Sequence, residues 1–272
     1  MSVWFCALLG VVQGLTEFLP VSSSGHLVIF QSLLSQAGQT GGWMFFDLML
    51  HLGTVLAVII AFWSDIAALF RAFIEMVLDR FRIRNIPERR FIVMILLSMI
   101  PLFFVLPFTD KIDELFSSPA AVGPALLFTA LLLLLSDRAS GGSLTERNAG
   151  FKSAVLVGIM QVIAVLPGVS RSGATIAGGT FNRYSKDFAV RFSFIMSLPV
   201  IIGANILTLP EAIANAGDAG QLPFYLVGIA AACLSGLAAI KTVRVLIRKK
   251  GLWPFAVYCI VVGAGVILFQ VL

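Results

Sequence analysis

GVVQGLTEFLPVSSSGH, residues 10–26, and GIMQVIAVLPGVSRSGA, residues 158–174, are two versions of one pattern. The two segments align without a gap at an offset of 148 residues. Their shared positions are Gly10/Gly158, Gln13/Gln161, Val21/Val169, Ser22/Ser170, Ser24/Ser172 and Gly25/Gly173. Each segment interrupts an apolar run with a proline and a group of small, polar residues. The chain therefore carries an internal duplication, and we expect one domain of residues 1–272 with repeats at about residues 1–148 and 149–272.

The apolar runs around these segments indicate a membrane protein. Of the 272 residues, 59% are hydrophobic and 12% are charged, whereas about a quarter of the residues in a soluble domain are charged. A helix needs about 20 apolar residues to cross the hydrocarbon core of a bilayer. Six stretches are expected to cross it, at residues 44–63, 91–108, 121–135 with its flanks, 188–209, 222–240 and 252–271. The net charge of +5 gives no reason to expect a nucleic-acid partner, because in a membrane protein the positions of the charges matter more than their sum.

The basic residues set the expected orientation. Arginines gather at residues 80–90, and lysines and arginines gather at residues 241–250, which places both loops in the cytoplasm. Counting spans from these loops leaves residues 1–43 and 153–182 as two regions that enter and leave the membrane on one side, so we predict two re-entrant helical hairpins. Three spans separate the two copies, so the second copy is inserted upside down. The predicted fold is an all-α polytopic membrane protein with six transmembrane helices and two re-entrant hairpins, arranged as inverted-topology repeats.

The two copies differ in their ionisable residues. Glu17 and His26 occur only in the first copy, and Arg171 occurs only in the second. Because a charge inside a bilayer is costly, these residues indicate a functional site where the hairpin tips meet; the alternative is a structural ion pair that locks the hairpins together. Ser23 and His26 are three residues apart, which allows a hydroxyl nucleophile beside a base, or a histidine that attacks or donates a proton. We therefore predict Glu17, Ser23, His26 and Arg171 as catalytic residues.

SRSGAT, residues 170–175, has the composition of a turn that binds an anion. Its hydroxyl groups, the backbone N–H groups beside glycine and the start of the following helix all favour negative charge, and the Arg171 guanidinium can donate two hydrogen bonds to phosphate oxygens. Small residues can instead serve the close packing of membrane helices. The predicted substrate-binding residues are Ser22, Gly168, Ser170, Ser172, Gly173 and Thr175.

Gln13 and Glu17 are four residues apart and share one face of a helix. One carboxylate and one amide are too few ligands for a cage made of protein alone, so the spacing predicts a divalent cation, Mg²⁺ or Ca²⁺, held jointly with substrate phosphates. We expect Asp47 to orient the site or its metal from behind, with a plain interfacial position as the alternative. Gln161 is expected to pack or to support the site in the same way.

The two motifs EFLPVSSSGH and LPGVSRSGAT together resemble those of the undecaprenyl-diphosphate phosphatase family, the bacitracin-resistance membrane enzymes. The resemblance extends over essentially the whole chain. The family pattern of Glu or Gln, three residues and Glu falls on Gln13 and Glu17, and the functional histidine of the family falls on His26. This chain has the rarer Gln form, which weakens Gln13 as a metal ligand and leaves Glu17 as the main carboxylate.

The resemblance implies hydrolysis of a polyprenyl diphosphate to the monophosphate, which recycles the lipid carrier of cell-wall synthesis with a divalent cation as cofactor. It also implies a multi-pass protein of the bacterial plasma membrane with an active site that opens to the outer face. The partners are then the prenyl lipid and the membrane, and a homodimer is left open. The rival class is a transporter or flippase for a phosphate-bearing lipid or anion, because inverted repeats of broken helices also build carriers.

Overall fold

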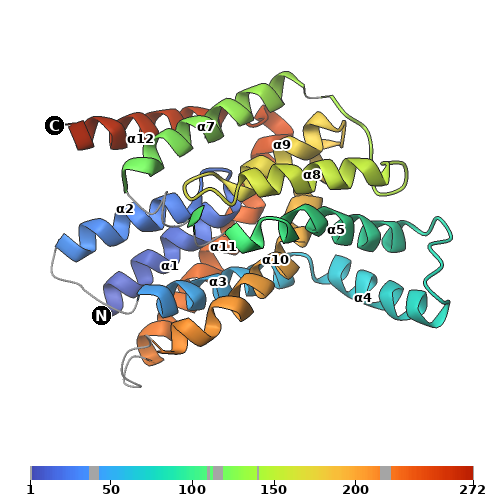
Figure 1. Ribbon diagram of the computed structural model, residues 1–272, viewed down its shortest axis with the longest axis horizontal. Coiled ribbons are helices and arrows are strands. Elements are labelled where there is room, and N and C mark those ends of the chain that lie inside the picture. Colours follow the sequence, from blue (N-terminus) through green and yellow to red (C-terminus); the bar gives the residue numbers. More distant parts are fainter. Residues whose placement is uncertain are drawn as a thin grey trace.

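The computed structural model describes residues 2–36, 43–108, 111–112, 119–139, 141–214 and 222–271. The described residues form helices, and no β-strand occurs among them. In chain order the elements are α1 (Val3–Phe18), α2 (Ser23–Gln36), α3 (Trp43–Ala61), α4 (Trp63–Leu78), α5 (Pro87–Phe103), the short 3₁₀ helix η1 (Leu106–Phe108), α7 (Pro119–Arg138), α8 (Phe151–Ile163), α9 (Arg171–Phe181), α10 (Lys186–Ala214), α11 (Leu222–Lys250) and α12 (Trp253–Val271). The prediction of an all-α protein is confirmed (Figure 1).

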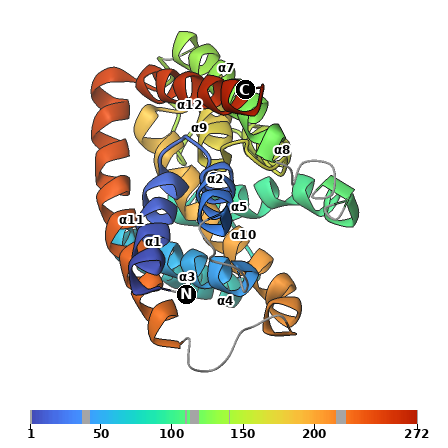
Figure 2. The same ribbon diagram turned by 90° about the vertical axis from the view of Figure 1, so that its left-hand side faces the viewer.

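Among the described residues, five segments are long and apolar enough to cross a membrane. They are Trp43–Ala61, Pro87–Phe108, Ala120–Arg138, Lys186–Pro210 and Leu222–Lys250. They coincide with the first five predicted spans, so a multi-pass membrane protein is confirmed. The sixth predicted span corresponds to α12. Its apolar segment, Trp253–Phe269, is shorter than the roughly 20 residues that a helix needs to cross the bilayer core. Figures 1 and 2 both show α12 lying alongside α7, so this helix is packed against a spanning partner.

Both regions predicted as hairpins consist of two short helices joined by a turn. One hairpin is α1 and α2, and the other is α8 and α9. In Figure 1 the open ends of the two hairpins point toward opposite ends of the molecule, and the two turns meet near its centre. None of these four helices reaches 18 residues. The turns thus bring the two duplicated motifs together inside the molecule.

Corresponding glycines of the two copies lie at tight helix crossings. An ideal Cβ atom placed on Gly10 would lie 2.5 Å from the carbonyl oxygen of Gly228 on α11, and one placed on Gly158 would lie 2.3 Å from the carbonyl oxygen of Ser98 on α5. Small residues permit this close approach of backbones, which stabilises helix association within a bilayer. Hairpin α1–α2 is thereby held by α11, and hairpin α8–α9 by α5.

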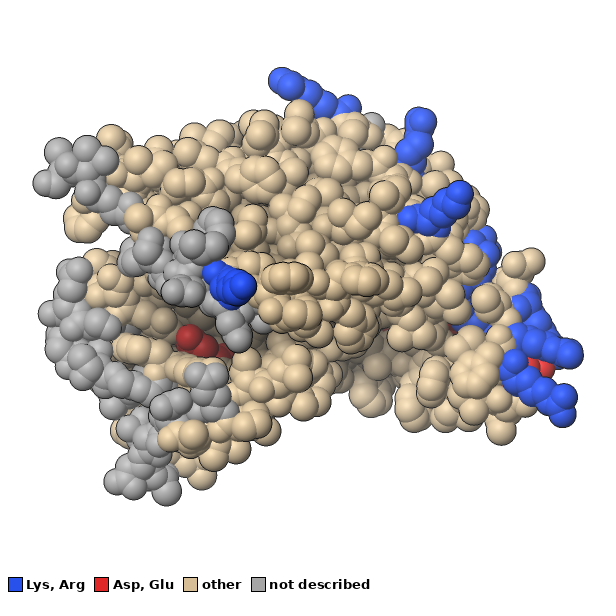
Figure 3. All heavy atoms as spheres, viewed as in Figure 1, with Lys and Arg blue, Asp and Glu red and all other residues tan. Residues whose placement is uncertain are grey.

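Charge is distributed unevenly along the long axis. Most of the Lys and Arg atoms visible in Figure 3 lie toward the right-hand end, whereas acidic atoms are visible inside a recess in the left half. At the basic end the loop between α4 and α5 is fixed by Arg89, which is only 5% exposed and donates to Asp79 at 2.8 Å. This hydrogen bond and the neighbouring arginines hold the pKa of Asp79 below its usual range.

Candidate functional site

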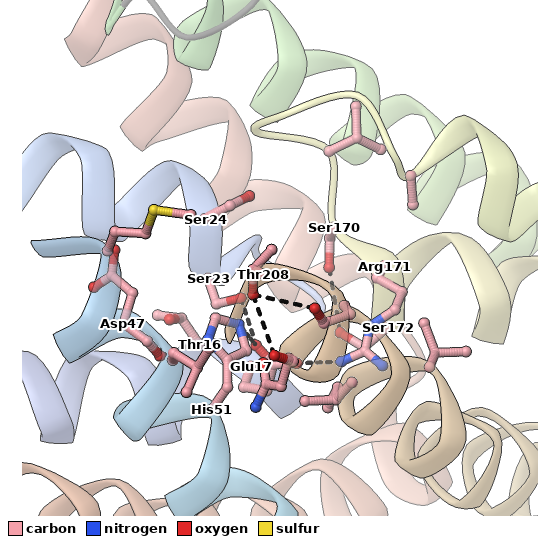
Figure 4. A pocket seen from close by; sticks show the side chains of 18 residues that line it. Thr16, Glu17, Ser23, Ser24, Asp47, His51, Ser170, Arg171, Ser172 and Thr208 are labelled. Carbon is pink, nitrogen blue, oxygen red and sulfur yellow. Dashed lines mark hydrogen bonds and ion pairs between the residues drawn. The ribbon is translucent and has the colours of Figure 1, made fainter. Parts of the chain in front are cut away.

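A cavity of about 400 Å³ lies where the two hairpin turns meet the helices α3 and α10. Figure 4 shows its polar side chains converging from both hairpins. The lining residues are Thr16, Glu17, Ser23, Ser24, Met44, Asp47, Leu48, His51, Ala164, Val169, Ser170, Arg171, Ser172, Val200, Ile201, Ala204, Asn205 and Thr208. The cavity therefore combines a carboxylate, a guanidinium and several hydroxyl groups between apolar walls.

Glu17 is the centre of the hydrogen-bond network. Its Oε2 accepts from Ser23 Oγ at 2.6 Å and from Gln13 Nε2 at 3.0 Å, and its Oε1 accepts from the Arg171 guanidinium. The Glu17 side chain is 4% exposed and the Arg171 side chain is 20% exposed. A buried carboxylate needs partners of this kind, because removing a charge from water without compensation is strongly unfavourable.

The sequence FLPVSS places Glu17 and Ser23 next to each other. Helix α1 ends at Phe18, which is buried and packs edge-on against Phe194 of α10 at a ring distance of 5.4 Å. The chain then turns through Pro20 and Ser22, and Ser22 has a φ of 71°. The Ser22 hydroxyl accepts from the N–H of Gly25 at 3.2 Å, which satisfies a free donor at the start of α2. This turn directs Ser23 back toward the carboxylate.

The second hairpin repeats the same cap. Ser170 is the N-cap of α9, and its hydroxyl accepts from the N–H of Gly173 at 3.1 Å. The two turns also contact each other in corresponding ways: the N–H of Gly168 donates to Ser24 Oγ at 3.3 Å, and Ser172 Oγ donates to the carbonyl of Leu19 at 3.2 Å. The first serine of the duplicated S-x-S motif thus caps its helix in both copies, and the second contacts the opposite turn, Ser24 as an acceptor and Ser172 as a donor.

Arg171 has hydrogen-bonding capacity that the protein does not use. Its Nη2 donates to Glu17, whereas its Nη1 is buried and has no partner among the described residues. Arg171 is also the first residue of α9, whose first backbone N–H groups have no partner within the helix. The Arg171 side chain lines the cavity and is 20% exposed, so this corner of the cavity is suited to an anion that accepts hydrogen bonds.

Six of the predicted site residues line the cavity: Glu17, Ser23, Asp47, Ser170, Arg171 and Ser172. Asp47 lies on the α3 wall and accepts from Gln31 Nε2 at 2.7 Å. The structure brings together the carboxylate, the arginine and the nucleophile candidate predicted from sequence. The ion pair between Glu17 and Arg171, which was the alternative to a functional site, is present, and both of its residues line the cavity.

The other predicted residues lie behind the wall: Gln13, Ser22, His26, Gln161, Gly168, Gly173 and Thr175. Thr175 donates to the carbonyl of Arg171 at 2.8 Å and is hydrogen-bonded to Ser193 at 2.6 Å. Gly168 has a φ of 89°, where a side chain would be strained, and an added Cβ atom would lie 2.8 Å from Ala125. These residues shape and fix the turns that carry the cavity residues.

His26 is directed away from the cavity. Its Nδ1–H donates to the carbonyl of Ser22 at 2.7 Å, and its Nε2 lies 2.8 Å from the hydroxyl of Tyr258 on α12. The imidazole also stacks on the Tyr258 ring, with a centroid distance of 5.6 Å. In this arrangement both ring nitrogens have protein partners. The predicted catalytic role of His26 stays a prediction.

The histidine that lines the cavity is His51. Its Nδ1–H donates to the carbonyl of Asp47 at 2.8 Å, and its Nε2 points toward Glu17, 4.0 Å from Oε2 (Figure 4). The sequence showed His51 four residues after Asp47 but gave no reason to assign it. Thr16 and Thr208 also line the cavity and were not assigned, and so does Asn205, which was expected from the sequence mainly to pack or to support the site. In the sequence, the only indication of such residues is that each is polar within an apolar helix.

The possible metal ligands at the cavity are too few to hold a cation alone, so other ligands would have to complete its coordination. No group of three or more His, Cys, Asp and Glu able to hold a metal ion occurs within the part of the chain that is described. Glu17 offers carboxylate oxygens to the cavity, and His51 lies beside it. Gln13 donates its amide to Glu17, and its Oε1 is buried without a partner among the described residues. Mg²⁺ commonly takes one or two carboxylates together with phosphate oxygens and water, so Glu17 is suited to such a shared site.

Comparisons with known proteins identify the family of this chain. The family model of the bacitracin resistance protein BacA matches residues 6–265. Undecaprenyl-diphosphatase of Methanosphaera stadtmanae is 37% identical over 280 residues, which cover 100% of this chain and 99% of the relative. Undecaprenyl-diphosphatase of Halothermothrix orenii is 37% identical over 270 residues, with 98% of both chains covered. That of Methanobrevibacter smithii is 38% identical over 271 residues, with 97% of this chain and 96% of the relative covered. With a match over nearly all of its length, the chain belongs to the family of the bacitracin resistance protein BacA.

Proposed function

We propose that the protein is a membrane phosphatase that hydrolyses undecaprenyl diphosphate, or a similar polyprenyl diphosphate, to the monophosphate and inorganic phosphate. This reaction recycles the lipid carrier of cell-wall synthesis. The observation that carries the proposal is the hydrogen bond of 2.6 Å between Ser23 and Glu17 in a cavity that also presents Arg171. Full-length relatives called undecaprenyl-diphosphatase support the choice of substrate.

Ser23 and Glu17 have the geometry of a nucleophile and its base. Ser23 Oγ attacks the terminal phosphorus and gives its proton to Glu17 Oε2, while the bond from that phosphorus to the bridging oxygen breaks. The prenyl monophosphate leaves, and a phosphoserine remains. Water then attacks this phosphoserine, releases inorganic phosphate and restores the Ser23 hydroxyl with the proton held by Glu17. Direct attack by water, with Glu17 as base, is the alternative course.

Arg171 and the start of α9 supply the positive field that phosphoryl transfer requires. The guanidinium has an unused donor at Nη1, and the hydroxyl groups of Ser170 and Ser172 lie on the same wall. Charge builds up on the phosphate oxygens during the reaction, and donors already fixed around them lower the barrier. Arg171, on the second hairpin, orients Glu17 of the first hairpin before substrate binds. During the reaction it orients the phosphate.

The proposed cofactor is a divalent cation, Mg²⁺ or Ca²⁺, with Glu17 as its protein ligand. When bound, such an ion neutralises charge on the phosphate oxygens. Gln13 orients Glu17 through its amide hydrogen bond of 3.0 Å, so its proposed contribution is to hold the carboxylate in place.

We propose that the two halves, at about residues 1–148 and 149–272, form inverted repeats and that the cavity opens to the outer face of the bacterial plasma membrane. The corresponding caps at Ser22 and Ser170 and the opposed hairpins in Figure 1 support the repeat. The outward opening is supported by the wall residues at the start of α3 and near the end of α10, far along both helices from the basic loops. A homodimer and the lack of a nucleic-acid partner stay predictions from sequence, which light scattering and a binding assay in detergent would check.

Release of phosphate by purified protein in detergent tests the proposed activity. No membrane then separates two compartments, so a transporter or flippase would bind the lipid without hydrolysing it. We expect phosphate release from farnesyl diphosphate and from undecaprenyl diphosphate, and loss of this release when a chelator removes divalent ions. Rapid acid quench with substrate labelled in the terminal phosphate should trap label on Ser23, and S23A should trap none. Hydrolysis by the wild type without any trapped label would indicate direct attack by water.

A further inference from the structure

An apolar groove lies beside the polar cavity, between α5 and α10. Its volume is about 170 Å³, and its walls include Met99, Phe103, Gly203 and Leu207. No charged residue lines it. Phe103 is 62% exposed and Leu207 is 66% exposed, so the outer edge of the groove opens to the lipid that surrounds the protein.

The groove and the cavity adjoin each other along α10. Val200 and Ala204 line both spaces and are one helical turn apart. Ala204 is exposed and Val200 is half-buried, so both residues present surface that a bound chain can contact. A molecule with a charged head and a hydrocarbon chain can therefore occupy both spaces at once, with its head beside Arg171 and its chain beside Gly203.

We propose that this groove binds the isoprene unit next to the diphosphate of the lipid substrate, an inference that rests on the proposed phosphatase function. An apolar cavity of about 150 Å³ holds benzene, which has six carbon atoms. A groove of about 170 Å³ therefore accommodates one isoprene unit of five carbons. The later units pass Phe103 and Leu207 into the bilayer. This subsite makes the enzyme selective for a diphosphate that carries a prenyl chain.

A second apolar groove also touches the cavity and is the rival route for the chain. It has a volume of about 340 Å³, and Ala121, Phe128 and Val169 are among the residues that line it. It shares one residue with the cavity, Val169, which is 5% exposed and stands as a wall between the two spaces. The groove on α10 shares two residues with the cavity, and neither of them is buried, so we assign the chain to it.

Gly203 allows the groove to be filled without disturbing the packing. An ideal Cβ atom on Gly203 has no heavy atom within 4 Å, and the same is true of Gly265 on α12, which does not line the groove. G203L therefore fills the groove, and G265L is the matched control for introducing leucine at a helical glycine. Burial of the first prenyl carbons is worth roughly tenfold or more in kcat/KM.

The measurement is the ratio of kcat/KM for farnesyl diphosphate to kcat/KM for methyl diphosphate. We expect G203L to lower this ratio at least tenfold, mainly through KM, and G265L to keep the wild-type ratio. An unchanged ratio in G203L, or a loss in A121L in place of G203L, overturns the assignment. If the wild type hydrolyses neither compound, the proposed function fails, which is a different result.

Photolabelling of the wild-type protein tests the same assignment without relying on a folded variant. A farnesyl diphosphate analogue with a diazirine in its first isoprene unit should label the peptide that contains residues 199–207. Excess unlabelled farnesyl diphosphate should prevent this labelling. Label on residues 121–128, or label at 199–207 that competition does not reduce, would contradict the proposal.

Discussion

Replacing Glu17 with glutamine separates the charge of this side chain from its shape. The amide keeps an oxygen that can accept a hydrogen bond from Arg171, but it cannot take the proton of Ser23. General-base catalysis contributes about 10²- to 10⁴-fold to rate, so E17Q should lower kcat by that factor. Because the base acts in the transition state, kcat/KM should fall by a similar factor.

The effect of E17Q on stability should be much smaller than its effect on rate. Glu17 accepts hydrogen bonds from Arg171, Ser23 and Gln13, and a hydrogen bond to a charged group is worth about 1.5–3 kcal/mol. Glutamine retains some of these bonds, and the 20% exposure of Arg171 to the cavity gives the freed guanidinium access to water. We expect a loss of about 1–3 kcal/mol in the free energy of unfolding.

Phosphate release from farnesyl diphosphate and thermal unfolding in detergent measure the two effects on one preparation. D79N is the matched control, because it removes a carboxylate that pairs with a buried arginine at the basic end of the molecule. D79N should keep at least half of the wild-type activity. If E17Q retained more than a tenth of wild-type kcat while folded, Glu17 would not be the base, and the assignment of Ser23 as nucleophile would lose its support.

Three further perturbations test other parts of the structure. H51Q should lower kcat about 10- to 100-fold in the phosphate assay without changing the melting temperature, because His51 lines the cavity and is half-exposed; wild-type activity would exclude a role in the reaction. G158L should destabilise the fold by about 1–3 kcal/mol in thermal unfolding, since its Cβ atom would lie 2.3 Å from the Ser98 carbonyl oxygen; an unchanged melting temperature would mean that this helix crossing is loose. The hydrogen bond from Arg89 is the main cause of the lowered pKa of Asp79. The ionised Asp79 therefore stabilises the fold fully above its ordinary pKa of about 3.9, and this stabilisation is lost as pH falls through the lower pKa of the folded state. The stability difference between wild type and D79N should therefore be largest near neutral pH and vanish in strong acid, and a difference independent of pH would contradict this ion pair.

The chemistry of the site could be predicted because its charged residues stand in the two copies of one duplicated motif. A carboxylate in one copy of a duplicated motif and a guanidinium in the other must find partners inside a membrane, so Glu17 and Arg171 could be paired from sequence. Residues that line the cavity and residues that fix the turn are adjacent in the chain, however. Ser22 and Ser23 differ by one position, yet the Ser22 hydroxyl accepts from the N–H of Gly25 and the Ser23 hydroxyl donates to Glu17. Sequence spacing does not contain the path of the turn that separates these two tasks.

The apolar pattern of the chain predicts its long membrane segments, because the thickness of the hydrocarbon core sets their length. The duplication follows from comparison of the chain with itself. The two histidines were not distinguishable in this way. His26 turns toward Tyr258, 232 residues away, and His51 faces Glu17 from another helix. Which face of a buried helix meets the cavity depends on how distant helices pack together, and in a lipid-embedded chain the hydrophobic pattern carries little information about that choice.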